Sequence, residues 1–374
     1  MTECSIVIPT YERPGYLKRI LGYYNDSHAV YNIIIADGSS EKIRKLNKEI
    51  VLSFPGLNIQ HLDKYSFGTT PDVRIADALE HVTTRYCVFC ADDDFITPNG
   101  IKQSLEFLEK NPDFTAAHGR YLGFYLREDG RGNQRLYWVP SFDSHESITF
   151  SDPVMRFSHH LSEYSQSTFY AVRRTDFLKM IYAENIKFTF NGLLIELFLS
   201  MLTLIYGKLK FLDVLYAARD SGSTPVTGYR PTLKDTIESG TYDKEYAKFR
   251  ECLSVHLSKQ SHLSIKESTK LVDEAMAAYL KKSGIPKRRI EFESKMRPVL
   301  DSLNLPDWVN REGKRLYAGV TGLRQDKKHP VETPVLPLSR KDFIKMTVSS
   351  KDYDDFERIR VHVLSSSEKN ANLT

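Results

Sequence analysis

The chain has 374 residues, of which 41% are hydrophobic, 27% are charged and 11% are aromatic, and its formal net charge is only +4. These values are typical of a folded protein with one large domain and a smaller appendage, and they exclude a chain without a packed core. The most apolar run, residues 193–206, is too short to span a bilayer, and the first residues lack the basic start of a secretion signal, so we expect a cytoplasmic protein.

The first part of the sequence alternates short apolar runs with amphipathic helical patterns, which is typical of βαβ units and a mostly parallel sheet. The expected strands lie at residues 5–9, 32–36, 57–62 and 86–91. The expected helices between them lie near residues 14–24, 41–53 and 72–81. Each strand ends in a polar or turn-forming segment, and ligands of open α/β sheets bind beyond these carboxyl ends.

Further elements complete the expected α/β domain, which we place at residues 1–220. Residues 114–140 are predicted to form antiparallel strands around a turn at 129–132. The helices expected after them lie near residues 153–161, 175–183 and 192–206, and the strands lie at 168–172 and 209–212.

Three more segments are expected after this domain. Residues 221–231 are dense in Gly, Ser, Thr and Pro, which is typical of a flexible linker or a lid. Residues 232–328 are predicted to form a smaller, mainly helical C-terminal domain, which includes a capping box from Ser264 to Glu267. Residues 329–374, with several prolines near their start, are predicted to be an extended and partly disordered tail.

Cys87 and Cys90 have the spacing of a redox or zinc-binding pair. They fall in a predicted strand, however, where residues three apart point to opposite faces. The sequence has four cysteines and no second Cys or His pair at zinc-finger spacing. We therefore interpret Cys87 and Cys90 as buried strand residues in a reducing compartment.

Three consecutive carboxylates, Asp92, Asp93 and Asp94, follow the predicted strand at 86–91. Neighbouring negative charges repel, so we expect a positive partner close to them. Hard divalent cations take oxygen ligands, and Mg²⁺ is usually held by one or two carboxylates together with substrate phosphates. The pattern therefore indicates a Mn²⁺ or Mg²⁺ site at Asp92 and Asp94, and the alternative is an exposed acidic turn that caps the next helix.

Three segments carry a resemblance to a known family: residues 5–13 (SIVIPTYER), 33–40 (IIIADGSS) and 86–94 (YCVFCADDD). Taken in this order and at these spacings, they resemble family-two glycosyltransferases of the GT-A fold. The resemblance implies an enzyme that moves a sugar from a nucleotide-diphosphate sugar, with UDP favoured, to an acceptor hydroxyl. It also implies inversion at the sugar carbon and dependence on a metal ion.

The resemblance assigns roles to single residues. The residues expected to bind the nucleotide sugar are Pro9, Thr10, Tyr11, Glu12, Asp37, Arg74, Asp92, Asp93 and Arg219. Among them, Asp37 matches the acid that hydrogen-bonds the base, and Arg219 could contact the diphosphate in a bidentate way. Asp92 and Asp94 match the metal-binding motif. As structural alternatives, Thr10 and Glu12 could simply end a strand, and Arg74 could pair with a surface carboxylate.

An inverting glycosyltransferase needs a base near the acceptor hydroxyl, and Glu196 is our candidate. It lies among apolar residues but shares one helical face with Gly192, Ser200 and Thr203. A carboxylate on that face would be partly desolvated, which suits proton abstraction. A glutamate with a purely structural salt bridge is the alternative.

Residues 216–220 (YAARD) resemble the segment where some family members place a diphosphate contact or a final metal ligand, so the resemblance implies that Asp220 could assist the metal ion. His159 and His160 are adjacent on a predicted helix, where side chains diverge by roughly 100°, so we do not expect them to share an ion. We interpret them as helix or acceptor-pocket residues.

Two other functions fit parts of the sequence. A sugar-nucleotide nucleotidyltransferase would share a related fold, but it needs a Gly-rich basic phosphate loop after the first strand, and residues 9–13 do not form one. A domain that binds a nucleotide sugar without catalysis is the second alternative, and the aspartate run argues against it.

The expected partners are a nucleotide-sugar donor and a carbohydrate, lipid-linked or protein acceptor, as in polysaccharide biosynthesis. No nucleic-acid partner is expected, because no binding motif favours one. Positive charge gathers between Lys281 and Lys328. We favour a solvated helical face there, and peripheral contact with anionic membrane lipids is the alternative.

Overall fold

The computed structural model describes residues 3–128, 134–140, 146–164, 167–188, 193–222, 237, 241–285 and 350–370. The predicted turn at 129–132, nearly all of the predicted linker or lid and most of the basic segment lie outside these ranges. Among the described helices, none combines the length and the apolar character needed to cross a membrane.

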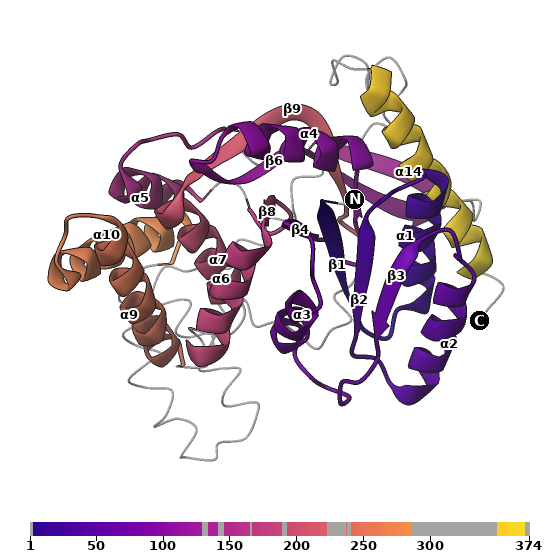
Figure 1. Cartoon of the computed structure of the whole chain (residues 1–374), viewed down its shortest axis with the longest axis horizontal. Helices are drawn as coiled ribbons and strands as arrows, with labels where there is room; N and C mark the ends of the chain where they lie inside the picture. The colour runs from indigo at the N-terminus through magenta and orange to yellow at the C-terminus, as the bar shows by residue number, and fades with distance from the viewer. Residues whose placement is uncertain are drawn as a thin grey trace, which may run out of the picture.

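Four parallel strands form one half of the central sheet (Figure 1). β1 (Cys4–Thr10) lies between β2 (Asn32–Asp37) and β4 (Tyr86–Phe89), and β3 (Asn58–Leu62) pairs with β2 on its other side. The first two strands and β4 are almost entirely buried, as expected for parallel strands that are covered on both faces. The prediction of a mixed α/β fold with a mostly parallel start is therefore confirmed.

The other half of the sheet mixes strand directions. β8 (Val172–Arg174) runs antiparallel to β4 and to β6 (Phe114–Glu128), whereas β9 (Lys208–Asp220) runs parallel to β6. β7 (Gln134–Pro140) pairs antiparallel with β6, and β5 (Phe95–Ile96) pairs antiparallel with β9. Two predicted strand limits were wrong: β8 starts at Val172 rather than at residue 168, and β9 continues to Asp220 rather than ending at residue 212.

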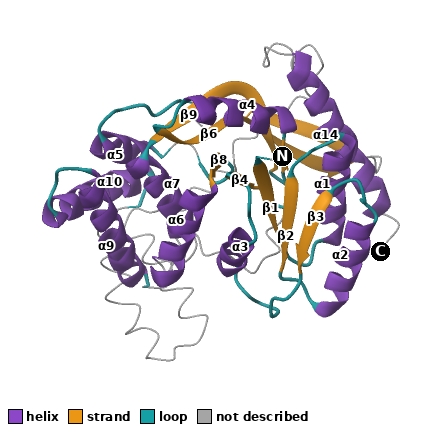
Figure 2. Cartoon of the chain, in the orientation of Figure 1, coloured by secondary structure: helices purple, strands orange, loops and turns teal. Residues whose placement is uncertain are grey.

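The N-terminal helices cover both faces of the parallel strands (Figure 2). They are α1 (Pro14–Asp26), α2 (Glu41–Leu52), α3 (Pro71–Glu80) and α4 (Pro98–Lys110). Three of them begin with proline, whose missing N–H costs nothing in the first turn. Leu17 and Ile20 of α1 share a cluster with Ile6, whereas Ile75 of α3 shares a different cluster with Val7, so the two helices lie on opposite faces of β1.

Five helices pack together on the side of the molecule away from β3 (Figure 1). They are α5 (Pro153–Glu163), α6 (Thr175–Phe188), α7 (Leu193–Tyr206), α9 (Tyr242–Gln260) and α10 (Ile265–Lys282). The predicted capping box of Ser264 and Glu267 begins α10. Buried residues of α9 and α10 belong to the same hydrophobic cluster as those of α7 and β1, so these helices share the core of the α/β unit.

The last described helix, α14 (Ser350–Asn370), corrects the prediction of an extended tail. It lies beside α1, on the opposite side of the molecule from α9 and α10 (Figure 1). Phe356, Ile359 and Val363 are buried in the cluster of α1, and the Phe356 ring centroid lies 4.4 Å from that of Trp138. These apolar positions recur at helical spacing, so burial of one face stabilises a helix whose other positions are mainly polar.

Asp355 on α14 makes stability depend on pH. It is 5% exposed, and burial raises the pKa of its carboxyl to about 6, although Arg358 at 3.6 Å opposes this shift. An unfolded aspartate has a pKa of about 3.9, so the folded state takes up a proton between about pH 4 and pH 6. The favourable contribution is complete below about pH 4 and is lost as the pH rises through about 6.

We therefore expect Asp355→Asn to raise the free energy of unfolding at pH 8 by about 1–3 kcal/mol and to change it little at pH 4. Urea unfolding at both pH values measures this difference. Glu49→Gln, at an exposed position of α2 and not among the groups that shift the pKa of Asp355, is the control. An equal gain at both pH values would contradict the assignment to Asp355 titration.

The cysteines agree with their sequence interpretation. All four are free and buried. Cys87 belongs to the hydrophobic cluster on the α3 face of the sheet and Cys90 to the cluster on the α1 face, so the two thiols point away from each other.

Candidate active site

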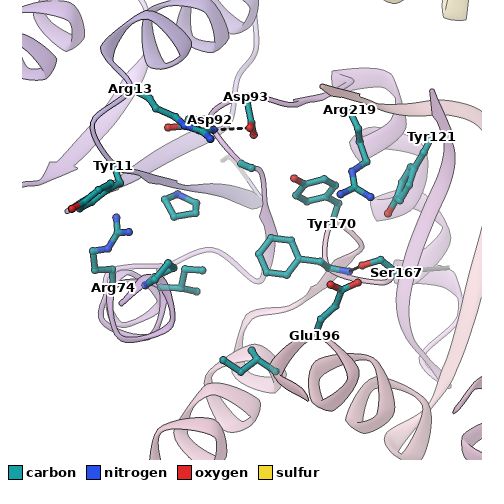
Figure 3. Close-up of a pocket in the computed structure, with 16 residues that line it drawn as sticks. Tyr11, Arg13, Arg74, Asp92, Asp93, Tyr121, Ser167, Tyr170, Glu196 and Arg219 are labelled. Atoms are coloured by element: carbon teal, nitrogen blue, oxygen red, sulfur yellow. Dashed lines mark hydrogen bonds and ion pairs between the residues drawn. The ribbon is translucent and has the colours of Figure 1, made fainter. Parts of the chain in front are cut away.

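A cavity of about 280 Å³ opens at the carboxyl ends of β1 and β4, close to the lower size limit of small-molecule sites (Figure 3). The strand ends form one wall, and the others come from the first turns of α3 and α7, the end of β9, β6 and the segment before β8. The predicted site residues that line it are Pro9, Tyr11, Arg74, Asp92, Asp93, Glu196 and Arg219. The fold thus gathers side chains that lie more than 200 residues apart in the sequence.

The aspartate run begins with a buried carboxylate tied to the first strand. Asp92 is 4% exposed, and its Oδ2 accepts a hydrogen bond of 2.7 Å from the Thr10 hydroxyl. Arg13 donates to both Asp92 and Asp93, at 3.3 and 2.6 Å. Thr10 is not among the residues that line the cavity but holds Asp92 through its hydroxyl, and its contact with the nucleotide stays a prediction.

Asp94 is not among the residues that line the cavity, whereas its neighbours Asp92 and Asp93 are. Its Oδ2 accepts a hydrogen bond from the Tyr170 hydroxyl and lies 3.6 Å from the Arg219 Nε, and its Oδ1 accepts from the backbone N–H of Asp220 at 2.7 Å. The side chain of Asp220 pairs with Arg19 at 3.4 Å. Asp94 therefore joins the end of β4 to the end of β9.

Negative charge in the aspartate run is only partly balanced. Burial, together with the charge of Asp93, raises the pKa of Asp92 to about 6 and that of Asp94 to about 7. Burial alone would lower the pKa of Arg13, but Asp92 and Asp93 outweigh it and raise that pKa. The prediction of a positive partner is met in part by Arg13 and Arg219, and a further cation beside the carboxylates would reduce the remaining repulsion.

Glu196 lines the cavity from α7, opposite the strand ends (Figure 3). Its Oε1 accepts a hydrogen bond of 2.9 Å from the Tyr164 hydroxyl. The face that it was expected to share with Ser200 and Thr203 is not open, because both hydroxyls are fully buried and bond to Thr168 and Arg173. Gly192 lies outside the described residues.

Arg74 is held by main-chain carbonyls and is 1% exposed. Its guanidinium donates to the carbonyl oxygens of Thr10 at 2.6 Å, Ala36 at 2.7 Å and Thr69 at 3.2 Å. The predicted pairing with a surface carboxylate is wrong, since the side chain fastens the ends of β1 and β2 from inside. Arg74 also lines the cavity, and its contact with a nucleotide sugar stays a prediction.

Gly38 leaves the space that this guanidinium fills. A Cβ at position 38 would lie 2.7 Å from both Cζ and Nε of Arg74. We expect Gly38→Ala to lower the free energy of unfolding by about 1–3 kcal/mol, because the buried arginine must shift. Gly56→Ala is the control, since its Cβ would meet nothing closer than 3.5 Å. Equal denaturation midpoints for the two variants would refute this role of Arg74.

Asp37 and Glu12 lie outside the cavity lining. Asp37 is fully buried and accepts hydrogen bonds from the Ser39 backbone N–H, from Asn47 and from His61, at 2.8–2.9 Å. Glu12 has a positive φ of 56° and accepts a hydrogen bond from the Ser40 backbone N–H. Both side chains shape the loops after β1 and β2, and their contact with a base stays a prediction.

Residues 5–174 match the family model described as glycosyl transferase family 2. This segment belongs to that family. The strand ends that carry the aspartate run, the Thr10 hydroxyl and the buried Asp37 all fall within the matched residues, so the resemblance seen in the three sequence segments is confirmed. No curated protein matches the sequence.

Solved structures with a related fold include S. aureus TarS. TarS 1–349 in complex with UDP-GlcNAc has a TM-score of 0.50 and 16% identity, and the alignment covers 75% of this chain and 73% of that chain. TarS 1–349 in complex with UDP has a TM-score of 0.47 and 16% identity, with 79% and 75% covered. A further TarS structure has a TM-score of 0.48 and 14% identity, and this chain spans only 44% of its length, with 75% of this chain covered. The likeness to the UDP-GlcNAc complex supports the GT-A fold.

Several residues of the cavity lining escaped prediction. The cavity lining also includes Arg13, Tyr121, Ser167, Phe169 and Tyr170. Arg13 ends the first of the three recognised segments, and its position three residues after Thr10 was the available signal. The other four come from β6 and the segment before β8, where the sequence offers no local pattern that distinguishes a cavity wall from a core.

The histidine pair lies apart from the cavity lining. His159 pairs with Glu146 at 2.7 Å, whereas His160 is buried, and burial lowers its pKa to about 3. The two side chains diverge as expected for helix neighbours, and neither lines the cavity.

Proposed function

We propose that the chain transfers a sugar from a UDP-sugar to an acceptor hydroxyl, with inversion at the anomeric carbon. The observation that carries this proposal is the cavity shared by Asp92, Asp93, Arg219 and Glu196. Groups suited to a diphosphate and a candidate base line one space, in which a donor and an acceptor can react at close range. Membership of residues 5–174 in glycosyl transferase family 2 supports the same chemistry.

The donor nucleotide is proposed to lie along the end of β1. Tyr11 stacks on Phe67 with ring centroids 5.5 Å apart, and Phe67 is 62% exposed, so an aromatic surface is open to a base beside the cavity. Arg219 is half-exposed, which leaves its guanidinium able to contact phosphate oxygens. UDP-sugars are the first donors to test, because the TarS structure that shares this fold contains UDP-GlcNAc.

The aspartate run fits a Mn²⁺ or Mg²⁺ ion by the chemistry of its oxygen donors. Asp92 and Asp93 line the cavity and would hold the ion, while Asp94, the other residue of the D-x-D pattern, supports the loop from behind. Such an ion would neutralise charge on the leaving diphosphate. Arg13, which bridges Asp92 and Asp93, would keep the two carboxylates in place.

Glu196 is proposed as the general base. Its carboxylate takes the proton of the acceptor hydroxyl while the acceptor oxygen bonds to the anomeric carbon, and the bond from that carbon to the diphosphate oxygen breaks. The hydrogen bond from Tyr164 fixes the carboxylate during this step. The acceptor, whether carbohydrate, lipid-linked or protein, would enter on the α7 side of the cavity.

A panel of nucleotide sugars with Mn²⁺ or Mg²⁺ tests the function. We expect release of UDP from at least one UDP-sugar, measured as nucleoside diphosphate formed. Formation of pyrophosphate from a nucleoside triphosphate and a sugar phosphate would instead establish nucleotidyl transfer. Binding of a donor with no diphosphate release under any condition would establish a binding domain without catalysis.

A further inference from the structure

Three side chains of different chemistry meet between α6 and α9, apart from the lining of the cavity described above. They are Glu184 of α6 and Cys252 and His256 of α9, and one donor atom of each lies within 4.8 Å of the others. The Cys252 Sγ is 3.8 Å and the His256 Nε2 is 3.9 Å from the same carboxylate oxygen, Oε2 of Glu184. Cys252 and His256 are four residues apart, so they share one face of α9.

These separations are close to those around a tetrahedral zinc ion. With Zn–S near 2.3 Å, Zn–N near 2.05 Å and Zn–O near 2.1 Å, tetrahedral angles place sulfur about 3.6 Å and nitrogen about 3.4 Å from the carboxylate oxygen. The distances in the protein exceed these values by only a few tenths of an ångström. The sulfur and nitrogen atoms lie within 4.8 Å of each other, so a side-chain adjustment that draws them together would bring all three atoms to one ion.

The surroundings favour a cation as well. Cys252 and His256 are 1% and 5% exposed, whereas the Glu184 side chain is 29% exposed and leaves a route from solvent. The Tyr206 hydroxyl lies 2.7 Å from the His256 Nδ1, the ring nitrogen that does not face Glu184. A hydrogen bond to that second nitrogen orients the ring, as is usual for histidines that bind metal through Nε2.

We propose that Glu184, Cys252 and His256 form a zinc site that joins α6 to α9, with a water molecule as the fourth ligand. Thiolate and imidazole donors select zinc over Mg²⁺, which prefers oxygen ligands alone. Binding releases the Cys252 thiol proton to solvent. The site is independent of the proposed Mn²⁺ or Mg²⁺ at the aspartate run.

A competing account is a hydrogen-bonded cluster that holds no metal. Burial and the charge of Glu184 raise the pKa of the Cys252 thiol, so without a metal ion the sulfur stays protonated and donates to Glu184. Lys187, 3.9 Å from Glu184 and 68% exposed, adds a nearby positive charge at the rim. The two accounts differ in whether a thiolate–metal bond forms, which spectroscopy detects directly.

Titration of the metal-stripped full chain with Co²⁺ provides the test. We expect a thiolate-to-cobalt charge-transfer band at one equivalent of Co²⁺, and displacement of the band by Zn²⁺. Cys252→Ser should abolish the band, whereas Cys4→Ser, which removes another buried thiol, should retain it. Tyr206→Phe should weaken Zn²⁺ affinity by about tenfold while keeping the band, because it loses only the hydrogen bond to His256.

The variants also separate the proposal from a folding defect. Cys252→Ser should have the far-ultraviolet circular dichroism of the wild-type chain, and its melting temperature should no longer rise with Zn²⁺. A band that persists in Cys252→Ser, or the lack of any band in the wild-type chain, would overturn the zinc site.

Discussion

Replacing Glu196 by glutamine is expected to lower kcat by roughly 10²–10⁴-fold, because the amide is no base for the acceptor proton. Glu196 lines the cavity, and the substitution keeps its size and its ability to accept from Tyr164. Donor binding, which depends on the other side of the cavity, should be unchanged. The rate of UDP release and the donor Kd from calorimetry give the two quantities separately.

Two further variants limit the interpretation. Tyr164→Phe leaves the carboxylate but removes its hydrogen-bond donor, so we expect a loss of up to about tenfold in kcat. Glu163→Gln changes an exposed glutamate that pairs with Lys282 and should have no effect on the rate. If Glu196→Gln turned over at the wild-type rate, another group would have to accept the proton, and Glu196 would be left as a structural partner of Tyr164.

Much of the N-terminal fold could be predicted because its signals are local. The apolar runs of β1, β2 and β4 and the stripe of Leu17, Ile20 and Leu21 on α1 repeat with strand and helix periods. Parallel strands bring their carboxyl ends to one edge of a sheet, so residues after β1 and β4 could be expected to meet. Pro9, Asp92 and Asp93 do line one cavity.

What the sequence concealed depends on contacts across the fold. A buried arginine next to a presumed phosphate site suggests a ligand contact, yet the charge of Arg74 is satisfied by carbonyl oxygens of Thr10 and Ala36. The orientation of Asp94 is set by Tyr170 and the backbone of Asp220, which are 76 and 126 residues away. No local pattern encodes those partners.

Apolar residues at helical spacing near the end of the chain indicate a helix, but the many polar residues around them hide this pattern. Phe356, Ile359 and Val363 occur at helical spacing, but charged residues surround them and the segment resembles a disordered tail in composition. Burial against α1 and Trp138 stabilises the helix. A polar composition does not predict disorder where the segment can bury a few apolar side chains against the rest of the fold.

The variant Asp92→Asn is expected to lower kcat/KM by on the order of 10²–10³-fold in saturating Mn²⁺. The metal ligands are either Asp92 and Asp94, as the D-x-D pattern predicts, or Asp92 and Asp93, which line the cavity. In both cases the substitution removes the charge of one ligand. The single oxygen of asparagine can still accept from Arg13 at the Oδ1 position, and its NH2 group, at the Oδ2 position, can donate to the Thr10 hydroxyl. Steady-state rates across a Mn²⁺ titration, for the variant and the wild type, measure the loss.

Removing the metal ion should lower the rate as much as neutralising the charge of Asp92 does. Wild-type enzyme treated with EDTA is expected to fall to the rate of Asp92→Asn, and added Mn²⁺ should restore only the wild type. Asp113→Asn, an exposed aspartate that pairs with Lys208, serves as the control. Full activity of the wild type in EDTA would mean that the arginines near the aspartate run, among them Arg13 and Arg219, supply enough positive charge without a metal ion. In that case the leaving diphosphate would be stabilised by guanidinium groups and the predicted metal site would be wrong.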